Sequence, residues 1–132
     1  MRIARGRAPG VPSEERGATF TGRVWADPVL GHPEDGVVVN NVFFEPGART
    51  HWHTHEVTQV LYVVAGEGWA QVRGGLGGRI KTGDTVHIPA GEEHWHGAGS
   101  DTYLLHLAVS VGETVWLDQV SAEDYDRAIA SA

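Results

Sequence analysis

In one short run of this sequence, three potential metal donors are separated by even numbers of residues. The run extends from Gly47 to Gln59 and contains His53, His55 and Gln59. Successive side chains of an extended strand point to opposite faces, so these three side chains share one face. The run therefore predicts strand segments that aim two imidazoles and a carboxamide at a common point.

A second run, from Pro89 to His96, places His94 and His96 two residues apart, again on one face of a strand. Two separate strands that each aim nitrogen donors inward can share one cation. The chain has no cysteine, so nitrogen and oxygen must hold any metal. Such donors suit manganese, iron, nickel, copper or zinc, and the residues alone do not choose between these ions.

The size and charge of the chain limit its class. Its 132 residues suit one domain, which we predict over residues 19–132, after an N-terminal arm over residues 1–18. No apolar stretch approaches the roughly 18 residues needed to cross a bilayer, and no signal-peptide core follows the first residues. The net charge of -7 would repel a phosphate backbone. We expect a cytoplasmic protein that binds neither membranes nor nucleic acid.

Glycine and proline divide the chain into short runs rich in β-branched and aromatic residues. Eighteen glycines and six prolines in this arrangement are typical of an all-β sandwich or barrel. The residues Ala65 to Gly68 predict a tight turn between two strands, 59–65 and 68–73. A short C-terminal helix is predicted after Ser121, with Asp124 as the acid of a capping box. The other predicted strands are 19–26, 37–44, 51–55, 79–81, 85–89, 94–98, 103–109 and 114–119.

The spacing of these residues resembles the two motifs of the cupin superfamily. Gly47, His53, His55, Gln59 and Gly66 match the first motif, and Gly83, Pro89, Ala90, Gly91 and His94 match the second. The resemblance implies a double-stranded β-helix, or jelly-roll barrel, with a metal inside near one mouth. Gln59 replaces the usual glutamate ligand, and Ala98 replaces the usual asparagine. A neutral carboxamide leaves the charge of a divalent ion uncompensated, which favours an anionic ligand.

A narrower resemblance, from about Thr19 to Tyr125, is to the bacterial manganese-dependent cupin hydroxynitrile lyases. It is carried by the segment 44–50, the two histidine runs and the segment 106–108. It implies a metal site of His53, His55, Gln59 and His94, with manganese as the first choice and iron, nickel or zinc as alternatives. It also implies that His96 and His106 are pocket histidines. His51 and Asn40 stand where the known lyases tend to have small residues.

Several further residues are candidates for the pocket. His96 shares a face with His94, and a neutral imidazole there can accept or donate a proton. His106 lies among leucines that would bury it, and we assign both histidines a catalytic role. Asn40, Val42, Phe44 and Leu61 are predicted to shape the substrate cavity, and His51 to line its rim.

The leading hypothesis is a metal-dependent carbon–carbon lyase that cleaves or forms cyanohydrins or acts on related small carbonyl compounds. Two alternatives are an iron-dependent cupin dioxygenase and a non-catalytic metal-binding accessory protein. The expected partner is a small-molecule substrate. The family resemblance also implies a homodimer or homotetramer, because cupin barrels generally pair through edge strands.

Overall fold

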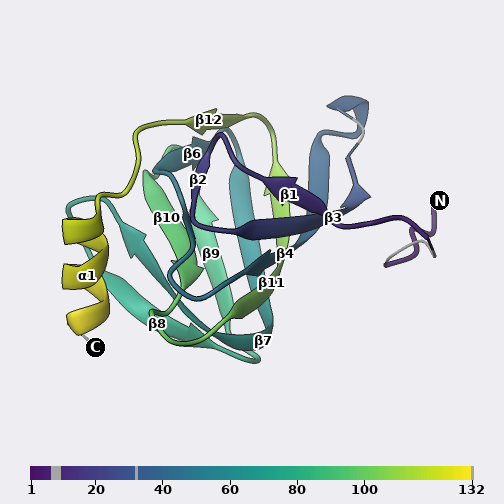
Figure 1. The fold of residues 1–132 in the computed structure, drawn as a ribbon. Helices are drawn as coiled ribbons and strands as arrows, with labels where there is room; N and C mark the ends of the chain where they lie inside the picture. The colour runs from purple at the N-terminus through teal and green to yellow at the C-terminus, as the bar shows by residue number, and fades with distance from the viewer. Residues whose placement is uncertain (7–9, 32, 132) are drawn as a thin grey trace.

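The fold is known from a computed structural model that describes residues 1–6, 10–31 and 33–131. Within these residues the chain forms one barrel of strands with a single α-helix beside it (Figure 1). The helix is α1 (Ala122–Ala130), and a 3-10 turn, η1 (Pro33–Asp35), precedes β4. The strands are β1 (Glu14–Arg16), β2 (Phe20–Thr21), β3 (Val24–Leu30), β4 (Val37–Phe44), β5 (Arg49–Thr50), β6 (His53–His55), β7 (Thr58–Val72), β8 (Gly77–Lys81), β9 (Thr85–Pro89), β10 (His94–Ala98), β11 (Leu104–Val111) and β12 (Thr114–Trp116).

Two antiparallel sheets share strand β7. The first sheet runs β1-β3-β4-β11-β7-β9, and it uses the N-terminal half of β7. The second sheet is built on the C-terminal half of β7, which pairs with β8 and β10, and β10 pairs in turn with β5 and β6. Strand β12 pairs with β6 and strand β2 pairs with β5 in this sheet. The prediction of an all-β jelly-roll barrel with a short C-terminal helix is confirmed.

The predicted turn at Ala65 to Gly68 is wrong, because the 15-residue strand β7 runs through these residues without interruption. Gly66 has a φ of 79°, and a side chain there would collide with the carbonyl of Tyr103. A side chain on Gly68 would collide with the carbonyl of Gly97. The register to β11 also slips beside Ala65. The two glycines and the bulge therefore bend β7 from one sheet into the other without reversing it.

Apolar residues form two separate cores. One fills the barrel and includes Phe44, Leu61 and Leu104, each 0% exposed. The other lies outside the second sheet, where Trp95 packs with Tyr125 of α1. Ser121 caps this helix as predicted and accepts a hydrogen bond from the Asp124 backbone N–H at 3.0 Å. The helix thus closes one outer face of the barrel.

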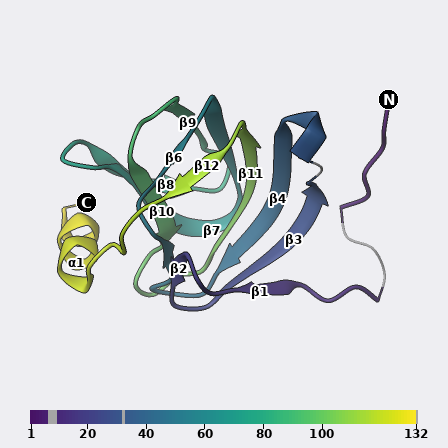
Figure 2. The ribbon, with the colours of Figure 1, turned by 90° about the horizontal axis from the view of Figure 1, so that it is seen from above.

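The N-terminal segment begins outside the barrel and joins it at β1, whose residues pair with β3 (Figure 2). Part of the predicted arm, Glu14–Arg16, thus lies on the edge of the first sheet, while residues 7–9 lie outside the described residues. The division at residue 18 stays a prediction. Among the described residues there is no helix that is long and apolar enough to span a membrane.

Candidate metal centre

Four strands direct polar side chains into the barrel interior at one end. His53 and His55 come from β6, Gln59 from β7, His94 and His96 from β10, and His106 from β11. None of these six side chains is more than 4% exposed. His53 and His94 are direct cross-strand partners, and their ring centroids lie 4.1 Å apart. Two histidines that are 41 positions apart in sequence thereby become neighbours.

The six residues surround a small cavity of about 150 Å³, which all of them except His94 line. Of the residues predicted to shape the pocket, Asn40, Val42 and Phe44 line this cavity as well. Leu61, which belongs to the same barrel core as Val42 and Phe44, is not among the lining residues, and neither is His51. The lining residues without a sequence-based prediction are Phe20, Val38, Thr50, Ala108, Ser110, Gly112, Thr114 and Trp116.

Some of these missed residues carried a usable signal. Val38 has the parity of Asn40 on β4, and Ala108 and Ser110 have the parity of His106 on β11, so alternation alone assigns them to the interior. Phe20 and Trp116 carried none, because they reach the cavity from short strands at opposite ends of the chain. The Trp116 ring lies 4.5 Å from the His53 ring and 5.7 Å from the Phe20 ring, between centroids.

Backbone carbonyls fix the tautomers of two histidines. His53 Nδ1 lies 2.9 Å from the carbonyl oxygen of His51, and His94 Nδ1 lies 2.9 Å from that of Glu92. Because a carbonyl only accepts, each Nδ1 carries the proton and each Nε2 keeps a lone pair. This is the arrangement that histidine ligands of metals commonly have. His51 thus contributes to the site through its backbone.

His55 is held by a side chain instead. Its Nδ1 lies 3.1 Å from the Thr114 hydroxyl, and its buried Nε2 has no hydrogen-bond partner. A buried polar atom without a partner is uncommon in proteins and calls for an explanation such as an absent ion or water. The Nε2 of His55 is therefore available as a third donor.

The Gln59 carboxamide completes the group of donors. Its Nε2 donates to the Ser110 hydroxyl at 3.1 Å, and its Oε1 lies 3.0 Å from His94 Nε2. Since the proton of His94 is on Nδ1, this approach brings two acceptor atoms together. A cation between them would turn that repulsion into attraction. The residues present therefore fit a metal ion held by buried imidazole nitrogens with the amide oxygen of Gln59 beside them.

Burial keeps these imidazoles neutral. Removal from water lowers the pKa of His94 to about 4, and it lowers the pKa of His53 well below 6.5. The pKa of His55 falls for the same reason, and interaction with the Gln59 side chain partly opposes the shift. A metal ligand must be unprotonated, so the low pKa values favour coordination at neutral pH.

His96 and His106 form a second, separate pair in the same cavity. His106 Nε2 and His96 Nδ1 lie 3.0 Å apart and share a proton, while His96 Nε2 and His106 Nδ1 have no partner. Burial lowers the pKa of His106 to about 4 and that of His96 well below 6.5, with nearby His106 adding to the effect on His96. The donor atoms of His53, His94 and His96 also lie within 4.8 Å of one another, so His96 borders the metal position.

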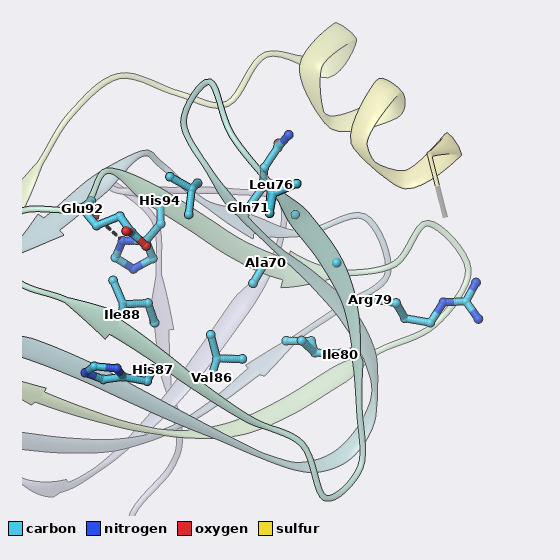
Figure 3. A pocket seen from close by; sticks show the side chains of 13 residues that line it. Ala70, Gln71, Leu76, Arg79, Ile80, Val86, His87, Ile88, Glu92 and His94 are labelled. Atoms are coloured by element: carbon cyan, nitrogen blue, oxygen red, sulfur yellow. Dashed lines mark hydrogen bonds between the residues drawn. The ribbon is translucent and has the colours of Figure 1, made fainter.

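A larger hollow of about 260 Å³ lies between β8, β9 and the C-terminal half of β7 (Figure 3). Its walls are mainly apolar and include Ile80, Val86 and Ile88. Of the six interior polar residues only His94 reaches it, with Nδ1 bonded to the Glu92 carbonyl. The other five polar residues line the smaller cavity, so we treat that cavity as the candidate site.

These features are those of a cupin: a jelly-roll barrel with clustered histidines inside one end. The family model for the cupin domain matches residues 40–111, and the chain belongs to this family. It is 47% identical over 113 residues to an (R)-mandelonitrile lyase from Granulicella tundricola, covering 82% of this chain and 86% of that protein. It is 33% identical over 75 residues to an acireductone dioxygenase from Gluconobacter oxydans, covering 54% of this chain and 40% of that one. A solved cupin-like protein from Thermotoga maritima superimposes with a TM-score of 0.84 at 38% identity, covering 92% of this chain and 97% of that chain.

The Ser110 hydroxyl is expected to position the Gln59 carboxamide for metal binding. Substitution Ser110→Ala removes the acceptor for Gln59 Nε2, so the affinity for Mn²⁺ should fall by roughly 10- to 100-fold, as for other residues that orient ligands. Titration calorimetry on metal-free protein measures the affinity. Ser110→Thr keeps the hydroxyl and should bind almost as wild type. Equal affinity of the alanine variant and wild type would contradict this role.

The lowered histidine pKa values predict how the stability of metal-free protein depends on pH. Between about pH 6.5 and 4 the unfolded chain binds protons that the folded chain excludes, so stability is greatest above pH 6.5 and falls as pH falls. Each such histidine contributes a slope of about 1.4 kcal/mol per pH unit. Urea unfolding at several pH values measures the slope. His106→Asn should reduce it, whereas His87→Asn, at an exposed site on β9, should not. A profile that is flat from pH 7 to 5 would refute the prediction.

Proposed function

We propose that this chain is a metal-dependent lyase of the hydroxynitrile lyase type, which splits a cyanohydrin into a carbonyl compound and hydrogen cyanide and catalyses the reverse addition. The observation that carries the proposal is the pairing of two groups in one buried cavity. One is a neutral donor set of three imidazoles and a carboxamide, and the other is the hydrogen-bonded pair His96 and His106. The 47% identity to a mandelonitrile lyase supports it.

The proposed ligands are His53, His55, Gln59 and His94, with manganese as the first choice of ion and iron, nickel or zinc as alternatives. No lining residue of the cavity is acidic, so the ligands do not cancel the charge of a divalent ion. When bound, such an ion supplies a Lewis acid that stabilises an anionic fragment. The cavity walls, including Val42 and Phe44, exclude water from that fragment.

In this proposal the pair His96 and His106 moves the proton. Both imidazoles are neutral, and each has one nitrogen without a partner, so one of them can accept the hydroxyl proton of the substrate. As the proton leaves, the oxygen becomes a carbonyl oxygen, the bond to the nitrile carbon breaks, and its electron pair leaves with cyanide. The same imidazole then returns the proton to cyanide. The hydrogen bond between the two rings spreads the positive charge that forms.

Phe20, Phe44 and Trp116 surround the cavity with aromatic surface. Aromatic side chains pack favourably against a flat apolar ring. We therefore propose a small substrate with an aryl group next to the reacting carbon, and mandelonitrile is the simplest test compound.

The manganese-loaded protein should release benzaldehyde from mandelonitrile faster than buffer does. His106→Asn removes a proton carrier and should lower kcat by roughly 10²- to 10⁴-fold at unchanged metal content. His55→Ala should lose both metal and activity, and His87→Asn should retain both. Absorbance of benzaldehyde gives the rate, and elemental analysis gives the metal content. A loaded wild type with no rate above buffer would exclude this substrate.

An iron-dependent dioxygenase is the second candidate, because the chain also resembles acireductone dioxygenases over about half its length. It spans about two fifths of the length of those proteins. A histidine site with open positions suits dioxygen chemistry with iron. Iron-loaded protein should then consume oxygen in the presence of an enediol or diketone, and an oxygen electrode measures this. Under the lyase proposal oxygen uptake stays at the level of the buffer control.

A further inference from the structure

The larger hollow lies where the barrel is open between its two sheets (Figure 3). Strand β8 pairs with β7 in the second sheet, and β9 pairs with β7 in the first. Among the described residues, β8 and β9 do not pair with each other, so no ladder of backbone hydrogen bonds closes this side. We call the space the β8–β9 hollow and define it by the residues Ala70, Gly78, Ile80, Val86, Ile88 and His94.

The hollow is open because two small residues face each other across β7 and β8. Ala70 and Gly78 are direct cross-strand partners. Gly78 shares the parity of Ile80, whose side chain lies in the barrel core, so a side chain on Gly78 would also point inward. The φ of Gly78 is not positive, and a Cβ there would meet no atom within 4 Å. Neither backbone conformation nor a close contact requires glycine here, and its effect is to leave space.

The strand residues that point into the hollow are apolar. The polar lining residues Gln71, Arg79 and His87 occupy the alternate positions on their strands and therefore belong to the opposite faces. Arg79 extends away from the other side chains (Figure 3). A charged group inside would lose its water without gaining a hydrogen bond, and Glu92 at the rim disfavours an anion further. These walls suit an uncharged, apolar occupant.

We propose that the β8–β9 hollow is a second ligand site, which binds a small uncharged aryl compound. Its volume is about 260 Å³. An apolar cavity of roughly 150 Å³ in another protein holds benzene, so this hollow has room for one ring with a short alkyl substituent. A rigid ring also loses less conformational freedom on binding than a flexible chain of equal size. Leu76 at the rim is 90% exposed and offers apolar surface that an occupant would cover.

His94 links this second site to the candidate metal centre. Its ring borders the hollow beside Ile88 (Figure 3), and its Nε2 lies 3.0 Å from Gln59 Oε1 inside the barrel. An occupant would pack against the ring and restrain it in the orientation that a metal needs. By thermodynamic linkage, occupant and metal then raise the affinity for each other by the same factor. The site itself does not rest on the proposed lyase activity, and only the coupling requires His94 to bind a metal.

Methyl NMR of the metal-free full chain with ethylbenzene as the probe tests the location. The isoleucines of the chain are Ile3, Ile80, Ile88 and Ile129. Ile80 and Ile88 line the hollow, and none of the four is among the residues that line the smaller cavity. Ethylbenzene should shift the methyl signals of Ile80 and Ile88 in a saturable way and leave the other two unchanged. Phenylacetate and benzylamine, which carry charges, should cause no comparable shift.

Substitution of Gly78 tests the same site by filling it. Gly78→Leu should lower the affinity for ethylbenzene by roughly 10-fold or more, because the leucine occupies the space of the ligand. Gly31→Leu is the matched control and should bind as wild type, since Gly31 is exposed and a Cβ there also meets no atom within 4 Å. Circular dichroism verifies folding. The wild-type methyl shifts decide the location even if Gly78→Leu does not fold.

Calorimetry with and without Mn²⁺ measures the coupling. The affinity of wild type for ethylbenzene should rise by roughly fivefold or more when the metal is bound, and equal affinities would overturn the coupling. The second site itself would be overturned by the absence of saturable shifts at Ile80 and Ile88, or by stronger binding of benzylamine than of ethylbenzene. Undiminished binding to folded Gly78→Leu would also overturn it and would place ethylbenzene in the smaller cavity. A failed lyase assay would leave all of these results unaffected.

Discussion

The site depends on one repeated hydrogen bond, from a histidine Nδ1 to the backbone carbonyl two residues earlier. His53 makes it to His51 and His94 makes it to Glu92, both at 2.9 Å. Each of these histidines is the first residue of its strand. The pairing of His53 with His94 then joins the two bonds into one unit. Tautomer, ring orientation and strand register are therefore determined together, before any ion binds.

In the proposed function, the same barrel geometry separates the metal ligands from the pair that transfers the proton. Along β10 the period of two places His94 and His96 on one face, but about 7 Å apart along the strand. His94 thus meets Gln59, while His96 meets His106 across the barrel. A sheet with the opposite register would have turned all of these rings to the outside. The register of β7 with β10 and β11 therefore decides which side chains face the cavity. The bend at Gly66 and Gly68 lies where β7 passes from one of these partners to the other.

The parts of the structure that follow from local periodicity could be predicted from the sequence. The parity of His53, His55 and Gln59, and of His94 and His96, placed these side chains on shared faces. The bend at Gly66 could not be told from a turn, because glycine permits both and only the carbonyl of Tyr103 decides. Phe20 and Trp116 could not be placed in the cavity, since their positions depend on how short terminal strands close the barrel. Leu61 has interior parity and belongs to the barrel core but does not line the cavity, a difference that alternation does not encode.

Gln59 connects the electrostatics of the site to its chemistry. A carboxylate at this position would place a negative charge among buried imidazoles, raise their pKa values and cancel part of the charge of a bound divalent ion. The carboxamide avoids this, but it needs a partner for its N–H groups, and Ser110 on β11 supplies one. Because β11 also carries His106, one strand positions both the hydrogen-bond partner of Gln59 and the imidazole to which the proposal assigns proton transfer.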